Sequence, residues 1–252
     1  MTAAAPPVLP AARPVLPTLL AVAHGTRDAD GVASAEALVA QVRLLRPDLR
    51  VERCFLGLVS PSLPEALARL TGEVVLVPLL LGAGYHVRVD IPEALAAAAH
   101  VRARVARALG PDALLADALA DRLADAGWRT GDGPVVLAAA GSSDPGANAD
   151  AAATASLLHD RLPGGHAVVP AYLCAAGPTP AEAVAALRAE GHSRVAVAPY
   201  LLSPGLFARR AARSGADLTS APLGTHDALA RLVTLRYDEA RGLVPSSRPR
   251  IG

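Results

Sequence analysis

Short apolar runs alternate with amphipathic segments along most of this chain. Residues 19–23 and 74–80 consist almost entirely of valine, leucine and alanine, which is typical of strands covered on both faces of a parallel sheet. Residues 31–45 instead place apolar side chains at helical spacing on one face. Strands that alternate with helices predict parallel sheets joined by right-handed crossover connections.

The elements predicted in the first half of the chain recur in the same order in the second half. For the first half we expect strands at 19–23, 51–58, 74–80 and 113–115, and helices at 31–45, from Ser62 onward, at 91–99 and at 116–126. For the second half we expect strands at 134–140, 167–173, 194–201 and 219–223, and helices at 146–161, 179–190, 207–215 and 226–240. The sequence therefore predicts an α/β protein of two similar lobes, each a parallel sheet flanked by helices.

The predicted lobes span residues 18–127 and 134–240, and a glycine-rich linker separates them. Residues 1–17 and 241–252 lack periodicity and are expected to be flexible tails. In sheets of this kind, ligands bind beyond the carboxyl ends of the strands. We therefore expect the active site in a cleft between the lobes.

Two histidines stand at predicted strand ends in the first copy only. His24 follows the first strand and His86 follows the third, whereas the matching positions of the second copy are Ala140 and Phe207. Imidazole is a common ligand of transition metals and a good base near pH 7. The duplicated layout therefore predicts a single asymmetric site, with His24 and His86 as candidate metal ligands and catalytic bases.

Composition excludes several classes of partner. Aromatic residues make up only 3% of the chain and the net charge is +1, so neither a nucleic-acid surface nor an anionic membrane is expected as a partner. Two cysteines are too few for a disulfide framework. Residues 1–17 lack a basic segment, and their prolines interrupt any apolar core, so we expect no secretory signal and a cytoplasmic location.

Motifs for nucleotides and for serine nucleophiles are missing. The chain has no GxxxxGK[ST] loop, and the glycines of residues 82–84 follow the third strand rather than the first, so no nucleotide cofactor is expected. Gly141-Ser142-Ser143-Asp144 lacks the GxSxG arrangement of a nucleophile elbow. Several arginines fall near the expected cleft, where they are either solvated or able to pair with ligand carboxylates: Arg27, Arg88, Arg209, Arg210 and Arg213.

Three motifs in order carry a family resemblance. They are His-Gly-Thr-Arg from His24, Phe-Leu-Gly-Leu from Phe55 with Pro-Ser-Leu-Pro-Glu from Pro61, and Gly-Tyr-His-Val-Arg from Gly84, continuing into Asp-Ile-Pro. With them the chain resembles the sirohydrochlorin chelatases, the class II chelatases that work without ATP.

The resemblance implies a lyase that inserts Fe²⁺ or Co²⁺, as substrate, into sirohydrochlorin during siroheme or cobalamin biosynthesis. It implies that His24 and His86 hold the metal and accept the pyrrole protons. Because that substrate is a polycarboxylate tetrapyrrole, we expect further residues near the cleft to bind it: Arg27, Arg88, Ser142, Ser143, Arg209 and Arg210. A monomer and a homodimer are both compatible with the sequence.

One departure from the family pattern leaves alternatives open. Many members carry Phe-Leu-Glu-Leu after the second strand, where this chain has Gly57; the matching position of the second copy is Cys174. A missing carboxylate is compatible with a chelatase of altered metal preference. It is also compatible with a carrier of metal or tetrapyrrole that does not turn over. An unrelated protein resembling periplasmic binding proteins would need a signal peptide, which residues 1–17 do not provide.

Overall fold

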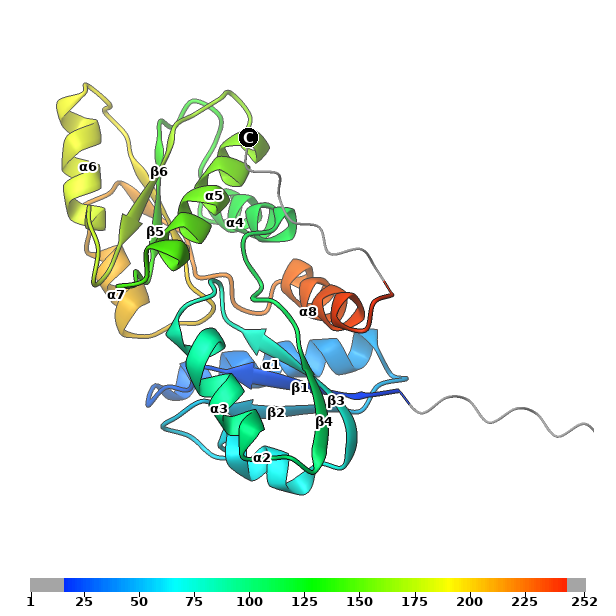
Figure 1. Cartoon of the computed structure of the whole chain (residues 1–252). Coiled ribbons are helices and arrows are strands. Elements are labelled where there is room, and N and C mark those ends of the chain that lie inside the picture. Colours follow the sequence, from blue (N-terminus) through cyan, green and yellow to red (C-terminus); the bar gives the residue numbers. More distant parts are fainter. Residues whose placement is uncertain (1–15, 244–252) are drawn as a thin grey trace, which may run out of the picture.

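The computed structural model describes residues 16–243, so most of the two expected tails lies outside the described residues. Two four-stranded parallel sheets form the framework, with strand orders β2-β1-β3-β4 and β6-β5-β7-β8. The identical orders confirm the predicted pair of α/β lobes, which Figure 1 shows one above the other. No helix within residues 16–243 is long and apolar enough to cross a membrane.

The strands and helices alternate through both copies. The strands are β1 (Thr18–Ala23), β2 (Val51–Phe55), β3 (Gly72–Leu79), β4 (Val101–Val105), β5 (Val135–Ala139), β6 (Val168–Tyr172), β7 (Ala196–Tyr200) and β8 (Leu218–Thr219). The helices are α1 (Ala29–Leu45), α2 (Leu63–Arg69), α3 (Ile91–Ala96), α4 (Ala113–Asp125), α5 (Pro145–Arg161), α6 (Pro180–Ala189), α7 (Leu206–Ala212) and α8 (Asp227–Ala240). One π-helical turn, His86–Asp90, leads directly into α3.

The central strands and the helix starts follow from local sequence. Every residue of β1 and of β5 is buried, and all of them except Thr18 are apolar. Helix α2 begins with the capping box that Ser62 and Glu65 predict, and α6 begins with the same arrangement at Thr179 and Glu182. The two copies therefore share their helix signals as well as their strands.

The fourth strand of the first lobe differs from the prediction. Residues 113–115 were expected to form it, but they are the first turn of α4, where Asp112 caps the helix by accepting from the backbone N–H of Leu114. The strand is β4, twelve residues earlier at its first residue, paired in parallel with β3. Its sequence alternates valine and alanine with exposed arginines because it lies at the edge of the sheet, and those arginines hide the apolar signal.

The last helix of each copy packs on the other copy. Helix α4 contacts α5 and β7 of the second lobe, whereas α8 returns to contact α1 and β3 of the first lobe. Figure 1 shows α8 beside α1 and α4 beside α5. The helices α4 and α8 also contact each other, so this exchange joins the two sheets through a shared layer.

Equivalent arginines anchor the exchanged helices. Arg236 of α8 is fully buried and donates to the backbone carbonyls of Ala108 and Leu109, just before α4. Arg122 of α4 donates in the same way to the carbonyl of Leu223, just before α8. Arg236 also forms ion pairs with carboxylates on both sides of the joint, those of Asp112 and Glu239. Equivalent contacts of Arg122 and Arg236 therefore join the two lobes, and Arg236 is the more deeply buried of the two arginines.

We predict that Arg236→Met lowers the free energy of unfolding by about 3 kcal/mol, because the buried carbonyls of Ala108 and Leu109 lose their donor and two carboxylates lose one arginine partner each. Urea unfolding followed by circular dichroism measures the change. Arg231→Met, an exposed position of the same helix, is the matched control and should leave the midpoint unchanged. Equal stability of the two variants would contradict the anchoring role of Arg236.

Candidate functional site

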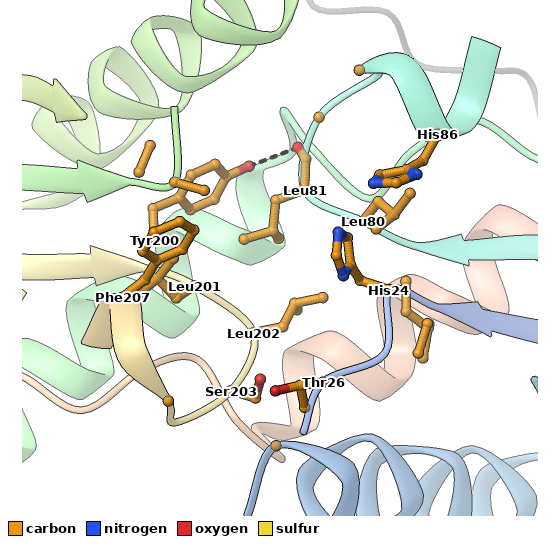
Figure 2. A pocket seen from close by; sticks show the side chains of 18 of the residues that line it. His24, Thr26, Leu80, Leu81, His86, Tyr200, Leu201, Leu202, Ser203 and Phe207 are labelled. Atoms are coloured by element: carbon orange, nitrogen blue, oxygen red, sulfur yellow. Dashed lines mark hydrogen bonds between the residues drawn. The ribbon is translucent and has the colours of Figure 1, made fainter. Parts of the chain in front are cut away.

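A cavity of about 730 Å³ lies between the lobes at the carboxyl ends of the central strands. Both lobes line it. The first lobe contributes His24 and His86, and the second lobe contributes Leu202 and Phe207 on the facing wall (Figure 2). The volume is in the range of small-molecule sites. The cleft therefore lies beyond the carboxyl ends of the strands, as the sequence predicts.

His24 owes its position to a turn that only glycine permits. Gly25 has a φ of 89°, and a Cβ built on it would lie 2.0 Å from the carbonyl oxygen of Gly57. The chain therefore turns sharply at the tip of β1 and leaves the His24 side chain exposed in the cavity. His24 Nδ1 lies 3.0 Å from the Gly25 carbonyl oxygen, to which it donates.

His86 stands on the π-helical turn that follows β3. Its Nδ1 is hydrogen-bonded to Asp90 Oδ2 on the same turn. The rings of His24 and His86 lie edge to face, with centroids 4.6 Å apart and planes at 89°. Figure 2 shows them together on one side of the cavity. The two strand ends thus bring together imidazoles that are far apart in the sequence.

Both rings keep one nitrogen available. Each Nδ1 has a hydrogen-bond acceptor, and Nε2 of neither ring has a partner among residues 16–243. In a neutral imidazole that donates from Nδ1, the lone pair is on Nε2. That lone pair can coordinate a divalent ion or accept a proton. A carboxylate behind a ligating histidine fixes its tautomer and the orientation of its ring, and Asp90 stands in this position relative to His86.

The histidine pair is not part of a larger metal cluster. Within the described part of the chain, no three His, Cys, Asp or Glu side chains converge as a metal site. An ion held here would have two protein ligands, so its other positions would be open to water or to a second molecule. Such a site is suited to passing an ion on rather than to storing it.

The wall opposite the histidines is mostly apolar. Leu201, Leu202 and Phe207 line it together with Tyr200, which lies beside Phe207 (Figure 2). Tyr200 is buried, its hydroxyl donates to the carbonyl of Leu81 across the cleft at 3.1 Å, and burial raises the pKa of its phenol well above the usual range. Tyr200 therefore remains neutral and ties β7 to the segment that leads to His86.

The other candidate residues separate into two groups. Ser142 lines the cavity, where its backbone N–H donates to Asn148 Oδ1. The remaining five are not part of the cavity wall: Arg27, Arg88, Ser143, Arg209 and Arg210. Arg210 lies over the Phe207 ring at 5.7 Å, whereas Arg88 and Arg209 form ion pairs with the opposite lobe.

Gly57 and Cys174 occupy equivalent places in the two lobes. The carbonyl oxygen of Cys174 approaches Gly141 as that of Gly57 approaches Gly25. A Cβ built on Gly57 meets nothing within 4 Å, so the backbone there has room for a side chain. Cys174 is exposed in the cavity, and its thiol donates to the carbonyl of Ala140 at 3.1 Å.

Sequence reasoning missed three acidic residues near the cleft. Asp90 follows His86 by one helical turn, a spacing that places two side chains on one face. Asp28 and Asp144 cap α1 and α5, and each pairs with an arginine of the other lobe. Their equal spacing from the first strand of each copy was the available signal, but their arginine partners depend on how the lobes pack.

Comparisons with known proteins agree with this geometry. The profile of the family described as CbiX matches residues 18–126 and 134–240. A sirohydrochlorin ferrochelatase of Priestia megaterium is 28% identical over 236 residues, covering 86% of this chain and 87% of the relative.

Two solved structures with bound metal share the fold. SirB from Bacillus subtilis with Fe³⁺ superposes with a TM-score of 0.77 at 27% identity, covering 88% of this chain and 94% of that one. The sirohydrochlorin chelatase SirB from Bacillus subtilis subspecies spizizenii in complex with cobalt gives a TM-score of 0.73 at 25% identity, covering 89% and 95%.

We predict that Asp90→Asn weakens Co²⁺ binding about tenfold, because the amide no longer holds the His86 ring as a carboxylate does. Isothermal titration calorimetry with Co²⁺ measures the dissociation constant. Asp160→Asn, on the exposed face of α5, is the matched control and should bind as the wild type does. An unchanged dissociation constant for Asp90→Asn would rule out its positioning role.

The glycine turn makes a second prediction. Gly25→Ala should lower the free energy of unfolding by at least about 1 kcal/mol, because alanine is strained at this φ and its Cβ meets a carbonyl oxygen. Gly57→Ala is the control, since its Cβ enters open space. Thermal unfolding compares the two variants, and equal melting temperatures would contradict the steric argument.

Proposed function

The chain belongs to the CbiX family of sirohydrochlorin chelatases, and on that premise we propose that it inserts a divalent metal ion, Fe²⁺ or Co²⁺, into sirohydrochlorin without ATP. The observation that carries the proposal is the pair of converging imidazoles at one wall of a cavity between the lobes. The related structures with Fe³⁺ and with cobalt support a metal as the substrate.

His24 and His86 are the proposed metal ligands. Their available Nε2 atoms supply two nitrogen donors, which suit Fe²⁺ and Co²⁺. Two ligands hold the ion without completing its coordination shell. The nitrogens of the macrocycle can therefore replace water first and the imidazoles afterwards.

The same histidines are the proposed proton acceptors. Insertion replaces two pyrrole N–H protons with one divalent ion, so two protons must leave for each ion that enters. As the ion moves to the macrocycle, each imidazole regains a lone pair and can take one of the two pyrrole protons. Asp90 stabilises the imidazolium that forms at His86, because it is hydrogen-bonded to the opposite ring nitrogen.

The apolar wall supplies the surface for the macrocycle. Leu202 and Phe207 face the histidines across the cavity, so a flat tetrapyrrole can lie between the wall and the metal. Ser142 is a polar group on the wall beside it.

A carrier function is the second candidate, and Gly57 favours it. The family resemblance places a carboxylate at this position in many members, and here the chain has none. A protein that binds metal or tetrapyrrole without turnover would keep the fold and both imidazoles. Turnover therefore separates the two functions, because a carrier stops after one equivalent.

We predict that the wild type metallates many equivalents of sirohydrochlorin with Co²⁺ or Fe²⁺ in an anaerobic spectrophotometric assay. The double variant His24→Ala, His86→Ala should lose at least about 100-fold in rate, because it lacks both ligand and base. His192→Ala, an exposed position of the second lobe, is the control and should keep the full rate.

Two results would contradict the chelatase proposal. One is a wild-type rate equal to the spontaneous rate with every divalent ion tried. The other is stoichiometric binding that stops after one equivalent, which would favour the carrier and make Gly57→Glu the next variant to assay.

A further inference from the structure

Two ion pairs of the same design join the lobes across the cleft. Arg88 Nη1 of the first lobe lies 3.1 Å from Asp144 Oδ2 of the second. Arg209 Nη1 of the second lobe lies 3.1 Å from Asp28 Oδ2 of the first. Each lobe thus contributes one arginine and one aspartate to these pairs.

The pairs occupy equivalent places in the duplicated fold. Arg88 and Arg209 each follow the end of the third strand of their copy, β3 or β7, by nine residues. Asp28 and Asp144 each follow the end of the first strand, β1 or β5, by five residues. Unrelated surface ion pairs would not recur at matching positions of both copies.

The aspartates divide their oxygens in the same way. Asp28 Oδ1 accepts from the backbone N–H of Asp30 at the start of α1, while Oδ2 faces Arg209. Asp144 Oδ1 accepts from the backbone N–H of Gly146 at the start of α5, while Oδ2 faces Arg88. If the arginine leaves, each aspartate therefore keeps a hydrogen bond and a favourable position at a helix N-terminus.

The arginines are held only weakly. Their side chains are 57% and 61% exposed, and ion pairs of this kind contribute at most about 1 kcal/mol each. A different carboxylate can therefore replace either aspartate at small cost, since the ion pair is exchanged rather than lost. The net charge of +1 provides no general attraction for an anion, so recognition of one must be local.

Each arginine also stands next to the cavity. Arg88 is two residues after His86, and Arg209 is two residues after Phe207, and both of those residues line the cavity on opposite walls. Each arginine is therefore close in sequence to a residue of the cavity wall, one in each lobe.

We propose that Arg88 and Arg209 determine specificity by exchange: Asp144 and Asp28 occupy them in the empty cleft, and two carboxylates of a planar polycarboxylate replace these aspartates when it enters. This inference rests on the proposed function, because it names how a substrate of that class is selected. In this role, Asp28 and Asp144 compete with the ligand's carboxylates for the two arginines.

If exchange occurs, substitution of the aspartates and substitution of the arginines change the ligand affinity in opposite directions. Removing the competitor with Asp28→Asn and Asp144→Asn frees the arginines, and asparagine still caps a helix as well as aspartate does. Removing the receptor with Arg88→Gln and Arg209→Gln leaves the ligand's carboxylates without these two guanidinium partners. If the pairs only held the lobes together, both double variants would break the same contact and shift affinity in the same direction.

The experiment measures the dissociation constant of metal-free sirohydrochlorin by anaerobic absorbance titration at low salt. We expect the asparagine double variant to bind about fivefold more tightly and the glutamine double variant at least about tenfold more weakly than the wild type. Arg102→Gln, on β4 at the far edge of the first sheet, is the control and should change affinity less than about twofold. Circular dichroism and thermal unfolding establish that all variants are folded.

Shifts in the same direction, or none in either double variant, would overturn the exchange. Wild-type turnover measured in parallel separates this failure from that of the proposed function. A wild type that turns over while its variants shift together is a chelatase without exchange. A wild type that neither binds nor metallates sirohydrochlorin overturns both.

Discussion

Neither Gly25 nor Gly141 has space for a side chain, because a carbonyl oxygen from the end of the neighbouring strand approaches each of them to about 2 Å of where a Cβ would stand. This contact brings the tip of the first strand against the exit of the second in both lobes. It sends the chain toward the cleft at the position of His24 in one lobe and of Ala140 in the other. Backbone packing thus sets the place of the side chain at this position, while its chemical identity is set by one residue.

Two further contacts between the lobes are less symmetric, and both hold the segment before His86. Asp150 of α5 accepts from the backbone N–H of Ala83, and Tyr200 donates to the carbonyl of Leu81. The matching segment of the second lobe has Ser203 and Pro204, and the position equivalent to Asp150 is Ser34. The second lobe therefore does more than close the cavity: it holds in place the loop that carries an imidazole of the first.

Apolar periodicity was enough to predict the central strands of both sheets, because they are buried on two faces and have few polar residues. It failed at β4, an edge strand whose exposed Arg102 and Arg104 interrupt the apolar run, and it mistook Leu114 and Leu115 for a strand when Asp112 caps a helix there. The histidine pair followed from the rule for strand ends. The ion pairs of Arg88 and Arg209 could not be predicted, because each depends on how one lobe faces the other rather than on local sequence.

The packing of α4 and α8 on the opposite lobe has a consequence for how such a chain arises. In a half-length chain of this topology, the last helix would find these contacts only on a second copy, as in a two-fold dimer. The fraction of dimer would then depend on the protein concentration. Joining the halves makes that association intramolecular and fixes it at a high effective concentration. It also frees the halves from being identical, so that one can keep two imidazoles while the other replaces them with Ala140 and Phe207. A symmetric dimer would repeat every change in both subunits, whereas the fused chain can devote one half to chemistry and the other to the shape of the site.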